Sequence, residues 1–111
     1  MNILSFLYWD SCNIKRKVKE VNPDTGVSET VLKTIATNIK CKLDEEQAPT
    51  LSGNEIDSYY TTYKLFTYPN TDIRIGDIID VAHFGDSYTF IASKPFKYQT
   101  HQEIKLEYKE R

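Results

Sequence analysis

The sequence predicts a mainly β protein: a small antiparallel β-barrel of six or seven strands, with one long loop and a short N-terminal helical segment. Apolar and polar residues alternate along several segments, and this period of two is the pattern of a half-buried strand. Turn-forming residues separate the segments at short intervals, as in small barrels and sandwiches. A length of 111 residues fits one domain, so we expect a helical or extended segment at 1–11 and a single domain at 12–111.

The elements follow in order along the chain. Alternation at 12–19 predicts a first strand, turn chemistry at 22–26 ends it, and 27–32 is expected to pair back as a hairpin. The clearest alternation, at 35–43, predicts the next strand, whose odd-numbered residues face the core. Aromatic and β-branched residues predict a strand at 59–68. Further strands are expected at 78–82, 88–92 and 101–109, and the expected core residues are Ile14, Val18, Ile35, Ile39, Cys41, Leu43, Leu65, Ile78, Phe90, Ile104 and Leu106.

Residues 44–57 interrupt this pattern and predict a long loop. They hold five acidic residues and no basic residue. A loop of this length in a small domain tends to be functional or mobile, which makes it the first candidate site. Its candidate residues are Asp44, Glu45, Glu46, Gln47, Pro49, Ser52, Gly53, Asn54, Glu55 and Asp57.

Composition and motifs exclude several classes of function. The net charge is −2, so there is no general reason to bind nucleic acid or an anionic membrane. The start of the chain lacks the features of a signal peptide, and the chain is expected to be made in the cytoplasm. Cys12, Cys41, His83 and His101 are too far apart for usual zinc spacing, and no nucleophile motif occurs. We therefore expect no enzyme activity, no metal and no cofactor, with a small hydrolase as the third choice.

A basic stretch, Lys15-Arg16-Lys17 with Lys19, leaves two interpretations open. One is a solvated strand, since lysines protect exposed strand edges from aggregation. The other combines these cations with tyrosines in a small barrel that binds single-stranded nucleic acid.

The second half of the chain contains an ordered set of motifs. Residues 72–79 have the pattern D-I-x-x-G-D-x-I and lead into a hairpin at Gly85-Asp86, and 101–106 have the pattern H-x-E-x-x-L. With 14–16, 38–43, 63–69 and 94–98, this order resembles the small head–tail connector proteins of tailed phages. The likeness is to the head-completion, or stopper, proteins of siphophages and PBSX-type prophages, and it covers most of residues 12–109.

The resemblance implies a β-barrel that assembles as a ring at the head–tail interface of the virion, and that can be a monomer in isolation. Such rings close the head after DNA packaging and receive the tail. The implied partners are portal and adaptor ring proteins, tail-completion proteins, further copies of the chain and the packaged double-stranded DNA, with no membrane. A neighbouring adaptor or a tail-completion protein is the alternative within this class.

In stopper proteins a long loop enters the central channel and helps to retain the DNA, and 44–57 stands at the matching place. Its carboxylates would repel the DNA phosphates, so closure would be mechanical. Eight tyrosines exceed the needs of a small core, and tyrosine is enriched at interfaces. The expected subunit interface comprises Lys15, Arg16, Lys17, Lys19, Tyr59, Tyr60 and Tyr63.

Overall fold

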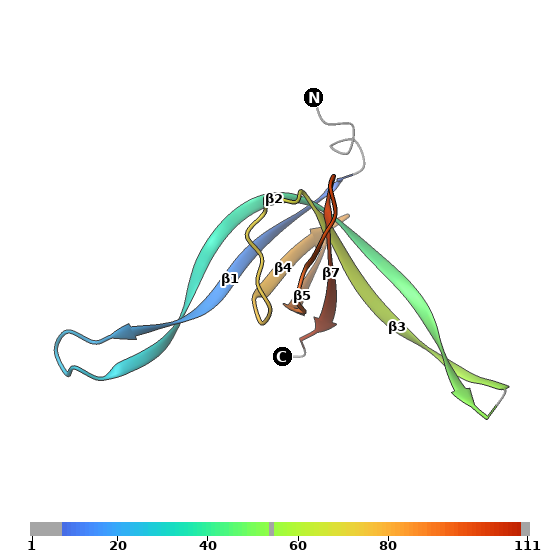
Figure 1. The fold of residues 1–111 in the computed structure, drawn as a ribbon, viewed down its shortest axis with the longest axis horizontal. Helices are drawn as coiled ribbons and strands as arrows, with labels where there is room; N and C mark the ends of the chain where they lie inside the picture. Colours follow the sequence, from blue (N-terminus) through green and yellow to red (C-terminus); the bar gives the residue numbers. More distant parts are fainter. Residues whose placement is uncertain (1–7, 54, 110–111) are drawn as a thin grey trace.

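The chain folds into one antiparallel sheet from which two long ribbons project (Figure 1). The computed structural model describes residues 8–53 and 55–109, and this part of the chain contains no helix. No segment within it therefore has the helical length and hydropathy that a membrane crossing requires. The strands are β1 (Asp10–Val21), β2 (Ser28–Ser52), β3 (Glu55–Thr67), β4 (Ile78–His83), β5 (Asp86–Ala92), β6 (Phe96–Lys97) and β7 (Gln102–Tyr108).

The strand order is β3-β2-β1-β4-β5-β7-β6, and β3 also pairs with β7. The pairings therefore form a closed circuit of six strands, to which β6 is added at the side of β7. The predicted mainly β, antiparallel chain of about seven strands is confirmed. All seven strands belong to one sheet, and β1, β2 and β3 extend well beyond the strands beside them (Figure 1), so the molecule lacks the compact outline of the small barrel expected from the sequence.

The core lies inside this circuit and is built from residues of its six strands. Ile14, Leu65, Ile79, Phe90 and Ile104 are fully buried. Most of the predicted core is confirmed, including Cys41, and the thiols of Cys12 and Cys41 are buried and free.

Three predicted core residues are not part of the buried core. Ile39 is partly buried and packs against it, and Ile35 and Val18 are on β2 and β1 toward the first ribbon. Ile35 is 37% exposed, because a register shift between Ile14 and Lys15 leaves it without a partner on β1. Val18 is only partly buried, because β4 pairs with β1 no further than Lys15. A bulge adds a residue to one strand and so changes which face the following residues occupy.

The prediction of a loop at 44–57 is wrong: residues 44–52 continue β2, and residues 55–57 begin β3, with which β2 forms a β-ribbon. β2 continues without interruption through 35–43 to Ser52, and its register with β3 ends at the pair Ser52–Glu55, with Gly53 in the turn at φ +67°. The alternation of a half-buried strand is absent because consecutive residues at 45–47 are all exposed. Pro49 is tolerated because β2 has only β3 beside it there, and proline is compatible with a strand edge.

The N-terminal helical segment expected at 1–11 is not seen in its described part. Tyr8 and Trp9 have no regular secondary structure, and β1 already begins at Asp10. The rest of that segment, residues 1–7, lies outside the described residues.

Candidate functional site

Two ribbons leave the body of the sheet in opposite directions, and we call them the first arm and the second arm (Figure 1). The first arm comprises residues 16–21 of β1 and 28–34 of β2, and the second comprises 43–52 of β2 and 55–62 of β3. β3 pairs with β7 only from Tyr63 onward, and β1 pairs with β4 only up to Lys15. Each arm is therefore two-stranded, and the strands described in the structure leave both of its edges unpaired.

Arg16 anchors the first arm to the body of the protein. Its Nε and Nη2 atoms donate to the two carboxylate oxygens of Asp77, each at 2.8 Å. Asp77 is 2% exposed and also accepts a hydrogen bond from the backbone N–H of Arg74 at 2.8 Å. The bond to Asp77 is the main reason that the pKa of Arg16 is raised, while the bond from Arg16 lowers the pKa of Asp72. The guanidinium is therefore already bound within the chain.

The four basic residues predicted for an interface fall into two pairs. Lys15 forms an ion pair with Asp80, with 3.0 Å between Nζ and Oδ2, so it and Arg16 have partners in the chain. Lys17 and Lys19 are exposed, and within the described residues neither takes part in an ion pair.

The three predicted interface tyrosines also divide. Tyr63 stands at the base of the second arm, with its ring centroid 5.0 Å from that of Phe90 and 6.2 Å from that of Tyr88. Burial, followed by the nearby charge of Glu45, raises the pKa of Tyr63. Tyr59 and Tyr60 lie further out on the arm and are 60% and 54% exposed. The two outer tyrosines are thus free to meet another molecule.

The acidic residues of the second arm lie on both of its faces. Glu45 is opposite Tyr63 in the register, and Glu46 is opposite Thr62, so consecutive carboxylates point to opposite sides. Ion pairs in the described part of the chain involve neither of them, nor Asp44.

The other candidate residues of 44–57 continue this ribbon toward its end. Gln47 donates to the Thr61 hydroxyl at 3.4 Å. Glu55 and Asp57 begin β3, and Asn54 lies outside the described residues.

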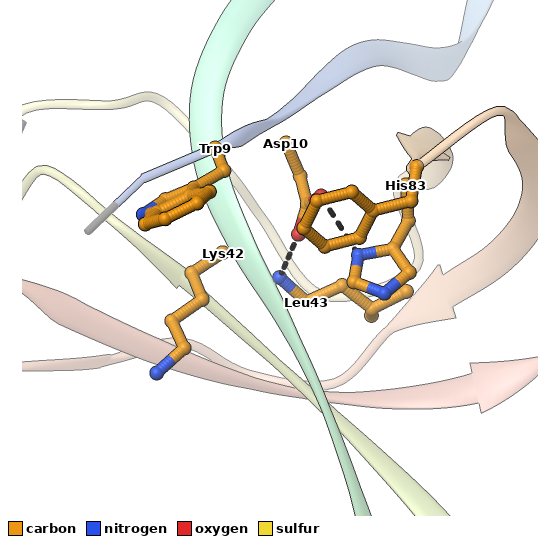
Figure 2. Close-up of a pocket in the computed structure, with 6 residues that line it drawn as sticks. Trp9, Asp10, Lys42, Leu43 and His83 are labelled. Atoms are coloured by element: carbon orange, nitrogen blue, oxygen red, sulfur yellow. Dashed lines mark hydrogen bonds and ion pairs between the residues drawn. The ribbon is translucent and has the colours of Figure 1, made fainter. Parts of the chain in front are cut away.

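A pocket that the sequence did not predict opens beside the start of β1 (Figure 2). Its volume is about 300 Å³, and its lining is Trp9, Asp10, Lys42, Leu43, His83 and Phe84. The buried Asp10 carboxylate accepts the Leu43 backbone N–H at 2.8 Å and lies 2.7 Å from His83 Nδ1. The polar groups at the base of the pocket are therefore already paired with one another.

Two exposed aromatic rings border this pocket. Trp9 and Phe84 are 72% and 75% exposed, and their ring centroids are 6.3 Å apart. Phe84 has a φ of +46°, in the left-handed region that a bulky residue rarely adopts. The arrangement can hold an apolar group between the two rings. In the sequence, the only signal was a large aromatic residue placed directly before Gly85.

The described residues contain no group of three or more His, Cys, Asp or Glu arranged as metal ligands.

Fold and arms together define a small all-β protein with two projecting ribbons. No family model and no curated protein matches the sequence. The fold is similar to that of the phage-like element PBSX protein xkdH from Bacillus subtilis, with a TM-score of 0.56. The match covers 89% of this chain and 93% of that chain, at 14% sequence identity. The two proteins therefore share an architecture over nearly their whole lengths.

Proposed function

We propose that this chain is a structural protein of a phage or prophage. Within the particle, we propose that it belongs to the head–tail connector, closes the head after DNA packaging and joins it to the tail. The observation that carries this proposal is the shared fold with a protein of a phage-like element, over 89% of one chain and 93% of the other. The order of motifs in the second half of the sequence supports it independently.

The motif residues have structural partners within this chain. Asp72 and Asp77 of the D-I-x-x-G-D-x-I motif bind Arg16. Glu103 of the H-x-E-x-x-L motif lies 3.0 Å from His101 Nε2 and 3.2 Å from Lys64 Nζ. The Arg16 contacts join β1 to the loop before β4, and the Lys64 contact joins β3 to β7, whereas His101 and Glu103 are local neighbours. The motifs therefore support an architecture shared with the connector proteins, whereas the proposed role depends on the arms.

The arms favour a role in assembly. A two-stranded ribbon alone is marginally stable in water, and both arms expose large apolar residues, including Leu32 and Tyr60. In a ring, these surfaces would be covered by neighbouring subunits and by the partner rings. The partner rings would be the portal or adaptor on one side and the tail-completion protein on the other. The role is structural and needs no catalysis or cofactor.

In this proposal the second arm faces the DNA channel. The segment 44–57 carries five carboxylates and no cation, so it would repel duplex DNA, which bears about one negative charge per 1.7 Å of its axis. DNA would pass without being gripped, and ribbons meeting across the axis would retain it. A ribbon moves as a unit about its base, whereas a loop would rearrange along its length.

The alternative that binds single-stranded nucleic acid is less favoured. Such a site needs cations and aromatic rings together in one groove. Among the residues predicted for such a site, the exposed cations Lys17 and Lys19 are on the first arm, whereas the exposed rings of Tyr59 and Tyr60 are on the second. A neighbouring adaptor or tail-completion protein is the second candidate, because it would use the same arms.

Deletion of the gene tests the proposal. Lysates would be examined by electron microscopy, and DNA in the heads by nuclease protection. We expect free tails beside heads that have lost their DNA, with restoration by the intact gene supplied in trans. Tailed, DNA-filled particles in the deletion would overturn the proposal.

A further inference from the structure

We propose that copies of this chain join head to tail, with the first arm of one copy docked on the second arm of the next through two faces of opposite charge. This inference rests on the proposed function, which calls for a ring. It adds the two surfaces that meet and the residues that carry the contact.

The first of these surfaces, the lysine face, lies on the first arm. Residues directly opposite in an antiparallel pair lie on the same face. Lys17 is opposite Leu32, and Lys19 is opposite Thr30, so these four side chains form one surface. All four are exposed, and Leu32 retains 50% of its surface. The lysine face thus combines two free cations with an apolar side chain.

The second surface, the Glu46 face, lies on the second arm. Glu46 is opposite Thr62, Ala48 is opposite Tyr60, and Asp44 precedes them on the same face. Opposite Asp44 is Lys64, which is held at 3.2 Å by Glu103. Lys105 is opposite Lys64 on β7, so lysines border this face at the base of the arm. Further out, the Glu46 face offers its carboxylate beside the half-exposed ring of Tyr60.

These two faces are complementary to each other. The lysines on the first arm are opposite in charge to the carboxylates on the second arm. Leu32 on the first arm and Tyr60 on the second arm each add apolar surface to the contact. Both charge sets are outside the ion pairs formed by the described residues, so docking would separate no existing pair.

One molecule cannot make this contact with itself. The arms point away from each other (Figure 1), and the chain extends 60 Å along its longest axis. In this proposal the occupant of each face is a second copy, whose other arm supplies the complementary charge. A contact between two different surfaces is heterologous, which is the geometry that closes rings.

Cysteine cross-linking tests the contact directly, including weak association. Lys17→Cys protein is mixed with Glu46→Cys protein and oxidised mildly. The native cysteines are buried, so the unsubstituted chain serves as the blank. The matched control is Glu45→Cys, one residue away on the opposite face. We expect the 17–46 disulfide to exceed the 17–45 disulfide at least tenfold. Equal yields, or no 17–46 product at high protein concentration, would overturn the proposal.

Charge exchange tests the electrostatic part of the contact. Glu46→Lys is expected to lower the fraction of oligomer measured by sedimentation. Where the chain stays monomeric, the readout is instead the yield of the disulfide between Leu32→Cys and Tyr60→Cys proteins, which Glu46→Lys is expected to lower. Lys17→Glu/Lys19→Glu in the other copy is expected to restore it. Glu45→Lys changes the net charge equally and should have little effect. Equal losses for Glu45→Lys and Glu46→Lys, or no restoration, would contradict the pairing of these faces.

The two proposals fail separately. Empty heads on gene deletion without selective 17–46 cross-linking would leave the connector role in place and overturn the docking. Selective 17–46 cross-linking, together with intact tailed particles after gene deletion, would leave the docking in place and overturn the connector role.

Discussion

Arg16 is the residue that ties the first arm to the body, because it neutralises the buried Asp77. We expect Arg16→Gln to lower the free energy of unfolding by about 3 kcal/mol, since it leaves a buried carboxylate without its partner. Urea denaturation measures this change. The adjacent exposed site provides the control: Lys17→Gln should change stability by less than about 0.5 kcal/mol. Similar effects of the two substitutions would contradict an anchoring role.

Glu103 gives the fold a dependence on acid pH. His101, and then Lys64, lower its pKa below the ordinary value of 4.5. A carboxylate whose folded pKa is depressed contributes stability above the unfolded value, and this contribution is lost as the pH falls through the folded value. We expect the urea midpoint to fall from about pH 4.5 downward, and to fall less in Glu103→Gln. An unchanged pH profile in that variant would show that Glu103 does not contribute.

For individual residues, the sequence predicted which side chains are buried better than it predicted which side chains pair with one another. Alternation correctly placed Cys41 in the core, where the hydrogen bond with Cys12, followed by burial, raises its pKa and keeps the thiol protonated. The Asp10–His83 and Arg16–Asp77 pairs join residues 73 and 61 positions apart. No local pattern encodes such distances, so these contacts follow only from the fold.

Among the strands, the second arm shows why alternation does not identify a strand that lies outside the core. Alternation arises where one face of a strand is buried and the other is wet. The side chains at 44–49 are outside the buried core, so this stretch of the ribbon has no alternation, and its proline and the glycine that follows resemble a loop. The strands of the body, such as β7, have one buried face and were predicted correctly.

The β4–β5 turn is an element whose geometry depends on glycine. Gly85 has a φ of +86° and follows Phe84 at +46°. We expect Gly85→Ala to lower the free energy of unfolding by about 1 kcal/mol, because a Cβ is unfavourable in this conformation. Thermal or urea unfolding measures it. In the companion variant Phe84→Gly, relief of the same strain should leave stability equal or higher. A stable Gly85→Ala would show that the turn adopts another conformation in solution.

At the scale of the whole molecule, the shape is more extended than the length requires. The radius of gyration is 16.9 Å, whereas a compact domain of this length has about 13 Å. The excess comes from the arms, which bury little surface within the chain. Such a shape is suited to a subunit whose stability and function are completed by neighbours.

The second arm can be shortened without touching the core. Replacing 47–61 with Asn-Gly keeps the pair Glu46–Thr62 and the buried Leu43 and Leu65 beyond it. We expect a folded protein whose unfolding free energy changes by at most about 1 kcal/mol, since the removed residues lie outside the core. We also expect that it fails to restore DNA retention in a deletion strain, as measured by nuclease protection. Full restoration would show that the arm is dispensable for closing the head.

The central claim is that this chain forms a ring between the head and the tail. Cryo-electron microscopy of purified particles tests it most directly. We expect a ring of this fold at the neck, with the first arm of each copy on the second arm of the next and the ends of the second arms toward the DNA axis. Particles that lack the chain, or that carry it away from the neck, would show that it forms no such ring.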